Sequence, residues 1–299
     1  MANLVAAAEL LHWRRNQLQA GGRPSQLDWL LDLAGGIPWQ TLQQLRLYPE
    51  QSVDLAVPLS RLEHLWREHL SSGAPLQYLV GRCPWRDLEL FVEPGALIPR
   101  QETELMIDLA EALLPHAMGH DRSNPLRWAD LGTGSGCLAL ALARTWPHSE
   151  GWAVDQSPVA LALAERNLRK DALGQTVQLR LGSWWEPLGE CQGSLNLVVA
   201  NPPYIPTQVW RELEPEVRDH EPELALHGGN DGLDAIRAIA SGAAEALAPG
   251  GWLLLEHHHD QSDAVLELLR ASGLDHAQDH CDLEGVRRFA SAQRKGAAS

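Results

Sequence analysis

The sequence is poor in cysteine and in long apolar runs. Its 4 cysteines are widely scattered and include no Cys-x-x-Cys pair. Disulfide frameworks and structural zinc sites need closely spaced cysteines, so we expect neither, and we expect a reducing cytoplasm. No apolar run approaches the ~18 residues of a membrane span. Glu9 interrupts the first apolar stretch ahead of Arg14, which is the wrong order for a secretory signal, so we predict no membrane association.

Positive charge is also scarce, with 24 Lys and Arg against 39 Asp and Glu and a formal net charge of −15. A protein that binds nucleic acid unaided normally presents a basic surface, because phosphate neutralisation dominates its affinity. We therefore expect no direct nucleic acid partner. Phenylalanine and tyrosine are rare too, at 2 and 3 against 12 Trp. We interpret the tryptophans as occupying ordinary aromatic core positions.

Apolar periodicity divides the chain into three parts. Residues 1–75 carry short amphipathic patterns separated by Gly and Pro, which predict a small helical bundle, and we interpret this part as a substrate-docking domain because it holds no catalytic motif. Residues 76–100 are punctuated by Gly and Pro and favour a β-hairpin or extended linker. Residues 101–299 alternate strands with helices. This alternation predicts an α/β fold with a doubly wound, mostly parallel sheet.

A glycine-rich turn, DLGTGSG at residues 130–136, stands between a predicted strand and a predicted helix. Glycines let the backbone approach a ligand closely, and a helix N-terminus offers free N–H groups. Asp155 ends the next predicted strand about 20 residues later, where an acid accepts hydrogen bonds from ribose hydroxyls. The pair predicts an adenosine-containing cofactor. A dinucleotide fingerprint would place its third glycine at Cys137, whereas the spacing here resembles motif I of S-adenosylmethionine-dependent methyltransferases.

A second motif, Asn201-Pro202-Pro203-Tyr204, follows the predicted strand at residues 195–200. Doubly wound sheets bind ligands at the carboxyl ends of their strands. A planar, conjugated amino group is a poor nucleophile because its lone pair is delocalised. An enzyme that methylates such a nitrogen can hold both N–H bonds with acceptors, here the Asn201 side-chain oxygen and the Pro202 carbonyl, while Tyr204 covers the planar group.

These motifs together resemble the HemK/PrmC family, which methylates the side-chain amide of the glutamine in the Gly-Gly-Gln motif of bacterial class I peptide chain release factors. The Asn-Pro-Pro-Tyr motif is shared with adenine-N6 methyltransferases, and further segments narrow the resemblance. These segments are Leu76-Gln77-Tyr78-Leu79 with Gly81-Arg82, Leu97-Ile98-Pro99-Arg100 with Glu102-Thr103-Glu104, Glu221-Pro222 with Ala225-Leu226, Gly228-Gly229 with Asp231-Gly232, and Leu253-Leu254-Leu255-Glu256.

The resemblance implies a Rossmann-like class I methyltransferase fold for residues 101–299 and assigns roles by position. The cofactor-binding residues it implies are Gly132, Thr133, Gly134, Ser135, Gly136, Asp155, Ser183, Trp184 and Asn201. The substrate slot it implies consists of Asn201, Pro202, Pro203 and Tyr204, with Asn201, Pro202 and Tyr204 as the catalytic residues. Ser183 departs from the family, in which an acid often precedes the tryptophan that contacts adenine.

The function implied is methyl transfer from S-adenosylmethionine to a release factor glutamine by a cytoplasmic enzyme, which we expect to be a monomer. Three alternatives stay open: an N6-adenine methyltransferase on DNA or RNA, an NAD-dependent oxidoreductase, and a non-catalytic partner-binding module. We predict no metal site, because the consecutive histidines at 257–259 splay and have no second ligand cluster. Arg100 is expected either to reach substrate or to pair with Glu102 or Glu104.

Overall fold

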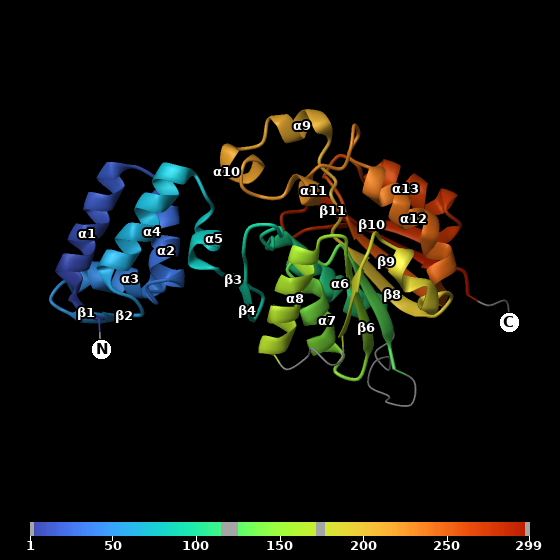
Figure 1. Cartoon of the computed structure of the whole chain (residues 1–299), viewed down its shortest axis with the longest axis horizontal. Coiled ribbons are helices and arrows are strands. Elements are labelled where there is room, and N and C mark those ends of the chain that lie inside the picture. The colour runs from blue at the N-terminus through green and yellow to red at the C-terminus, as the bar shows by residue number, and fades with distance from the viewer. Residues whose placement is uncertain (1–2, 115–124, 172–176, 297–299) are drawn as a thin grey trace. The chain divides into compact units, whose positions relative to one another are not determined.

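The computed structural model describes residues 3–114, 125–171 and 177–296 (Figure 1). The chain forms two compact units. Unit 1 comprises Met1–Cys83 with Pro215–His220, and unit 2 comprises Pro84–Glu214 with Glu221–Ser299. The division expected from the sequence, into a docking domain (1–75), a linker (76–100) and a methyltransferase domain (101–299), stays a prediction.

Unit 1 is mainly helical, as its amphipathic patterns predict. Its elements are β1 (Asn3–Ala6), α1 (Ala7–Ala20), α2 (Pro24–Leu33), α3 (Trp39–Leu47), β2 (Ser52–Leu55), α4 (Leu59–Ser72), α5 (Leu76–Val80) and the distant α10 (Pro215–Arg218). Trp66 and the leucines of α2 and α4 fill its core. The antiparallel β1–β2 pair is not predicted, because four-residue strands alternate too briefly to be told from a helix end.

The distant segment joins unit 1 through polar contacts. The Gln26 side-chain amide lies 3.4 Å from Glu216 Oε2, and His220 Nε2 lies 3.0 Å from the Ser72 carbonyl oxygen. Unit 1 is therefore built from two stretches of chain that are far apart in sequence. Sequence patterns do not predict this, because the segment is short and carries no periodicity.

Unit 2 contains a seven-stranded sheet in the order β10-β11-β9-β8-β5-β6-β7. Its strands are β5 (Arg127–Leu131), β6 (Glu150–Asp155), β7 (Val177–Leu181), β8 (Leu195–Ala200), β9 (Leu247–Glu256), β10 (Leu274–Cys281) and β11 (Arg287–Arg294). The five strands from β9 to β7 pair in parallel, and β11 pairs antiparallel with both β9 and β10. The predicted doubly wound, mostly parallel α/β fold is confirmed.

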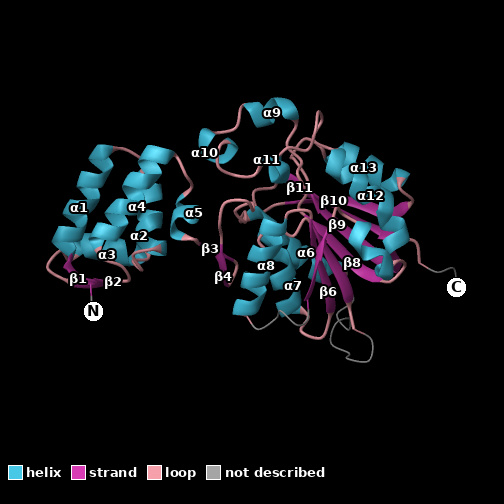
Figure 2. Cartoon of the chain, in the orientation of Figure 1, coloured by secondary structure: helices cyan, strands magenta, loops and turns pink. Residues whose placement is uncertain are grey.

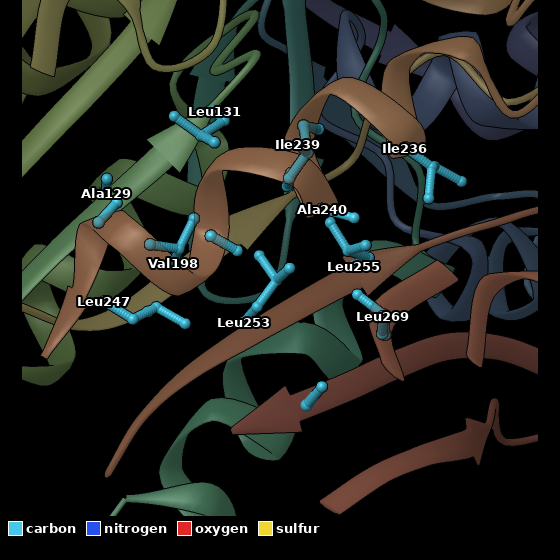
Figure 3. Packing of buried hydrophobic residues seen from close by; sticks show 14 of the residues in the cluster. Ala129, Leu131, Val198, Ile236, Ile239, Ala240, Leu247, Leu253, Leu255 and Leu269 are labelled. Atoms are coloured by element: carbon cyan, nitrogen blue, oxygen red, sulfur yellow. The ribbon is translucent and has the colours of Figure 1, made fainter. Parts of the chain in front are cut away.

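Helices cover both faces of this sheet (Figure 2). They are α6 (Leu105–Leu113), α7 (Cys137–Thr145), α8 (Pro158–Lys170), α12 (Asp234–Ala246) and α13 (Ser262–Ala271). Successive strand residues pack into opposite layers: Leu253 and Leu255 lie in the core cluster with α12 and α13, whereas Leu254 lies in the cluster with α6 and α7. Figure 3 shows the first layer, in which Ile236, Ile239 and Ala240 of α12 belong to the same core cluster as Val198, Leu253 and Leu255 of the strands. Burial on both faces explains the continuous apolar runs of these strands.

A short segment precedes the sheet. Residues 76–100, expected as a hairpin or linker, begin with the five-residue helix α5 and continue into an antiparallel hairpin of β3 (Arg82–Trp85) and β4 (Leu88–Phe91). Trp85 is buried, and its ring N–H donates to the Arg100 carbonyl at 2.7 Å. A short 3-10 helix, η1 (Glu102–Glu104), follows and leads into α6. The hairpin thus fixes where residues 95–104 meet the sheet.

Candidate active site

The glycine-rich turn leaves β5 at the carboxyl edge of the sheet, as predicted. Gly134 and Gly136 have φ angles of 55° and 82°, in the left-handed region that favours glycine. A Cβ atom on Gly136 would lie 3.0 Å from Ala164 Cβ, so this glycine permits α7 to begin against α8. A Cβ atom on Gly134 would meet no atom within 4 Å. The backbone at Gly134 therefore faces open space, where a ligand can approach it closely.

Asp155 lies at the end of β6 beside this turn. Its Oδ2 accepts the Gly134 N–H at 2.9 Å, and its Oδ1 accepts the Ser157 N–H at 2.8 Å. Burial raises the pKa of Asp155, and these backbone donors oppose the rise. Each carboxylate oxygen retains a lone pair. The carboxylate is thus held in one orientation with acceptor capacity left for ribose hydroxyls.

Trp184 occupies a strained backbone conformation beside the turn. Its φ of 48° is uncommon for a non-glycine residue, and such strain is concentrated at functional sites. A Cβ atom on Gly132 would lie 3.4 Å from the Trp184 ring, so the glycine allows the ring to lie close to the turn. Trp184 also lines the cavity described below, and its contact with adenine stays a prediction.

Asp130 is the first residue of the glycine-rich turn, and its side chain is fully buried under that turn. Its Oδ2 accepts the Thr133 hydroxyl at 2.6 Å and the Ala139 N–H at 3.2 Å. Its Oδ1 has no hydrogen-bond partner among the described residues. Burial raises the pKa of Asp130 to about 7. Asp130 therefore fixes the turn to the first turn of α7 at a cost in desolvation.

A cavity lies between the turn and the segments that face it. Its empty space amounts to about 790 Å³, part of which is open to solvent. The predicted residues that line it are Gly132, Gly134, Asp155, Ser183, Trp184, Asn201 and Pro203. Residues not predicted for the site also line it, namely Gly95, Ala96, Leu97, Pro222, Leu224 and Ala225 among others.

Five predicted site residues lie outside this lining: Thr133, Ser135, Gly136, Pro202 and Tyr204. Three of them support the turn, since Thr133 bonds to Asp130, the Ser135 carbonyl accepts the Asn167 amide at 2.8 Å, and Gly136 admits α8. Their roles, like those of the lining residues, stay predictions.

Asn201 and Glu256 emerge side by side because of the sheet register. Ala200 of β8 pairs with Leu255 of β9 in parallel, so the next residue of each strand lies at the same edge. The Asn201 amide N–H donates to Thr103 Oγ1 at 3.0 Å, and the Thr103 hydroxyl donates to Glu256 Oε2 at 2.6 Å. The Tyr204 hydroxyl donates to Glu256 Oε1 at 2.9 Å. The acceptor loop, residues 201–204, is thus anchored at both ends to one buried carboxylate.

Sequence analysis did not select Thr103 or Glu256 as functional residues, although both stand in segments that carry the family resemblance. Burial raises the pKa of Glu256, while the hydroxyls of Thr103 and Tyr204 oppose the rise. The Tyr204 phenol has a pKa well above its usual value, chiefly because it is buried. It therefore remains an O–H donor at neutral pH.

The Gly-Gly-x-Asp-Gly segment supports the acceptor loop from behind. A Cβ atom on Gly228 would lie 2.6 Å from the Pro203 carbonyl oxygen, and one on Gly232 would collide with the Tyr204 carbonyl. Gln261 donates to the Tyr204 and Asp231 carbonyls at 3.0 Å each. These contacts leave no room for side chains, which explains why glycines stand at both positions.

Arg100 pairs with Glu221 at 2.7 Å, so the expected pairing with Glu102 or Glu104 is wrong. The Glu221 carboxylate also accepts the Ile98 N–H at 3.1 Å and is almost completely buried. A buried carboxylate requires such partners, and the more exposed acids near Arg100 do not. The pair joins the stretch before η1 to the stretch after the acceptor loop.

The histidine run at residues 257–259 forms local contacts. His258 Nδ1 lies 2.6 Å from Asp260 Oδ1, and burial lowers the pKa of His257. Across residues 3–114, 125–171 and 177–296, no group of three or more His, Cys, Asp or Glu side chains is arranged to hold a metal ion. In the same ranges no helix is both long and apolar enough to cross a membrane.

The groups that line the cavity suit the chemistry of S-adenosylmethionine. The open backbone at Gly134 admits a ligand without steric conflict, and Asp155 offers acceptors to a ribose. Trp184 offers an aromatic face, and the residues from 95 to 97 add an apolar wall. The acceptor loop adjoins this space through Asn201 and Pro203.

Comparisons with known proteins agree with this geometry. Residues 103–212 match the methyltransferase small domain. A release factor glutamine methyltransferase of Prochlorococcus marinus is 52% identical over 97% of both chains, and one of Thermosynechococcus vestitus is 42% identical over 94% of this chain and 96% of that protein. The hMettl16 catalytic domain shares the fold, with a TM-score of 0.55, 14% identity and coverage of 80% of this chain and 82% of its own. An S-adenosylmethionine-dependent methyltransferase fold, an intact acceptor loop and this similarity along almost the whole sequence show that the chain belongs to the release factor glutamine methyltransferase family.

Proposed function

We propose that this enzyme transfers a methyl group from S-adenosylmethionine to the side-chain amide nitrogen of the Gly-Gly-Gln glutamine in a class I peptide chain release factor. The observation that carries the proposal is the free oxygen of Asn201. Its amide nitrogen is engaged by Thr103, whereas Oδ1 accepts no hydrogen bond from the described residues, and Asn201 lines the cavity. A free acceptor beside a cofactor cavity suits a substrate that must be held by its N–H bonds.

Residues of the acceptor loop would orient the side-chain amide of the substrate glutamine. Asn201 Oδ1 and the Pro202 carbonyl would accept one N–H each, and this pair of bonds turns the face of the nitrogen toward the cavity. As positive charge develops on the nitrogen, both oxygens stabilise it without having to reorient. S-adenosylmethionine, when bound, would supply the methyl group: the N–C bond forms as the S–C bond breaks, the sulfur keeps the bonding electron pair, and the nitrogen then releases one proton to solvent. Asp155, Trp184 and the backbone at Gly134 would hold that cofactor.

Unit 1 supports a role in recognising the intact protein substrate. It contains none of the residues that line the cavity. Its helix α3 and the residue that follows expose large apolar side chains, with Trp39 62%, Leu47 74% and Tyr48 51% accessible. Large apolar side chains exposed along one helix are candidates for contact with a protein partner. We place the docking of the release factor on this helix.

A set of surface variants tests the docking role. Trp39→Ala and Leu47→Ala should raise KM for the intact release factor, while the affinity for S-adenosylmethionine and the Tm stay at wild-type values. Leu283→Ala is the matched control, at a side chain of unit 2 that is 94% accessible. It should leave KM, the affinity for S-adenosylmethionine and the Tm unchanged. Equal effects of all three variants, or none, would remove α3 from substrate recognition.

The chemical assignment is tested by labelling. The enzyme is incubated with methyl-labelled S-adenosylmethionine and either a release factor or nucleic acid, and the label is mapped. We expect label on the glutamine amide alone, since the acidic chain disfavours nucleic acid. Label on adenine would overturn the proposal in favour of the N6-adenine reading. A cytoplasmic location also belongs to this proposal, supported by a translation factor as substrate and by the scattered cysteines; the expected monomeric state stays a prediction.

A further inference from the structure

Two side chains outside the cavity lining control the only polar contact of the Asn201 side chain within the described residues. Thr103 and Glu256 are each 2% accessible, and they come from η1 and from the end of β9. Together with Asn201 they form a line of hydrogen bonds: Asn201 Nδ2 donates to Thr103 Oγ1, and Thr103 Oγ1 donates to Glu256 Oε2. Tyr204 closes the line on the other carboxylate oxygen.

The direction of each bond follows from counting protons. A hydroxyl has one proton and two lone pairs, whereas an ionised carboxylate only accepts. The 2.6 Å distance between Thr103 Oγ1 and Glu256 Oε2 is that of an O–H···O bond, and the Tyr204 hydroxyl donates to the other oxygen of the same carboxylate. The Thr103 proton is thus committed to Glu256, and only lone pairs of Thr103 face Asn201. Asn201 must present its NH₂ group there, which leaves Oδ1 on the opposite side.

We propose that Thr103 and Glu256 are positioning residues, which fix the Asn201 amide in the single orientation that presents Oδ1 to the substrate N–H bond. This inference rests on the proposed function and names residues that decide how its acceptor is aimed. If the Asn201 amide were turned by 180°, its NH₂ group would face the N–H bond of the substrate amide. Two hydrogen-bond donors would then oppose each other. The buried carboxylate prevents that turn from a distance, without touching the substrate.

Thr103 provides the first test. Thr103→Val keeps the shape of the side chain but removes the acceptor for Asn201, so the amide loses its preferred orientation. We expect kcat to fall by roughly 10- to 100-fold, the cost of misplacing a reacting group, while the calorimetric affinity for S-adenosylmethionine and KM for the release factor hold. Thr103→Ser should restore most of the lost rate because it restores the hydroxyl.

A matched control separates orientation from general destabilisation. Ser149 is a buried hydroxyl of unit 2 that accepts the Trp128 ring N–H at 2.8 Å, away from the cavity lining. Ser149→Ala should lower the Tm as Thr103→Val does but leave kcat unchanged. Retention of kcat in Thr103→Val, or a loss in Ser149→Ala of the same size, would overturn the positioning role.

The direction itself is tested by reversing it. Asn201→Asp places a second acceptor against the lone pairs of Thr103, so the line of hydrogen bonds is broken. Glu256→Gln can supply an N–H to Thr103 and still accept from Tyr204, which frees the Thr103 proton to point toward residue 201. The double variant Asn201→Asp/Glu256→Gln then satisfies every member again with the line reversed. We expect its Tm to be about 2–4 °C higher than the Tm obtained by adding the Tm shifts of the two single variants. This difference corresponds to a coupling free energy of about 1 kcal/mol.

Two controls complete this cycle, which needs neither cofactor nor substrate. Asn201→Asp combined with Ser149→Ala should be additive, because the two sites share no partner. The coupling between Asn201→Asp and Glu256→Gln should disappear in a Thr103→Val background, since the hydroxyl transmits it. Coupling that persists there would show direct repulsion between carboxylates and would overturn the proposal, as would additivity in the first cycle. If the wild-type enzyme fails to methylate a release factor, the Tm cycle still reports on the network, so the two failures are distinguishable.

Discussion

The two halves of the candidate site are built in different ways. The cofactor half consists of the glycine turn, Asp155 and Trp184, and it is held mainly by backbone N–H groups and left-handed glycines. The acceptor half consists of residues 201–204, and it is held by side chains from residues 103, 256 and 261. The first half is local in sequence and the second depends on long-range contacts. Binding and catalysis should therefore respond separately to mutation.

Asn201→Ala is expected to have the largest effect of these variants, and we expect that effect on kcat rather than on cofactor binding. It removes the acceptor for one substrate N–H, and we expect kcat to drop by roughly 10²-fold or more, as for one lost preorganised polar group. The affinity for S-adenosylmethionine should change far less, because the cofactor half is intact. Single-turnover methyl transfer at saturating cofactor measures this, and a near-wild-type rate would show that the loop is only a turn.

Asp155→Ala should produce the opposite pattern. The lost carboxylate removes charge-assisted bonds to the ribose, so we expect S-adenosylmethionine to bind more weakly by ~1.5–3 kcal/mol. At saturating cofactor kcat should be nearly preserved. Calorimetric titration decides the matter, and unchanged affinity in a folded variant would exclude Asp155 from the cofactor site.

Asp130 makes the cofactor half sensitive to pH. Because burial raises its folded pKa from the usual 3.8 to about 7, the folded state binds a proton that the unfolded state has released above pH 4. This contribution to stability is complete below pH 4 and is lost as the pH rises through 7. Between pH 6 and pH 8 it should cost about 1.4 kcal/mol of unfolding free energy.

The isosteric variant Asp130→Asn has no proton to lose, so its unfolding free energy should lack this decline. Denaturant titrations of both proteins at pH 6 and pH 8 give the difference directly. Parallel pH dependence in the two proteins would show that Asp130 stays charged in the folded state.

Ser183→Ala should have the smallest effect. Ser183 directly precedes Trp184, and it lines the cavity. Loss of one neutral hydrogen bond to adenine would weaken cofactor binding by about 0.5–1.5 kcal/mol. Ser183→Ala with wild-type affinity would mean that the adenine amino group finds its partner elsewhere.

The contrast between the halves also explains what the sequence could predict. The bounds of β8, Leu195–Ala200, match the strand predicted at residues 195–200, because this element carries its own apolar run and ends at a proline-rich turn. Asp155 and the glycine turn were identifiable because a fixed strand–turn–helix order brings them together. Thr103, Glu256 and Glu221 were not, since each acts through a contact that only the folded sheet creates. The partner of Arg100 was wrong for the same reason: burial, rather than proximity in sequence, selected Glu221.

The Glu221 carboxylate has a kinetic consequence. It ties the cavity wall at Gly95–Leu97 to the wall at Pro222–Ala225 through the Ile98 N–H and the Arg100 guanidinium. Moving either stretch alone would leave a buried charge without its counter-ion, which is costly. The two stretches therefore open together or remain shut. A molecule enclosed by these two stretches should therefore enter and leave through their joint opening, so we expect the ion pair to slow binding and release together.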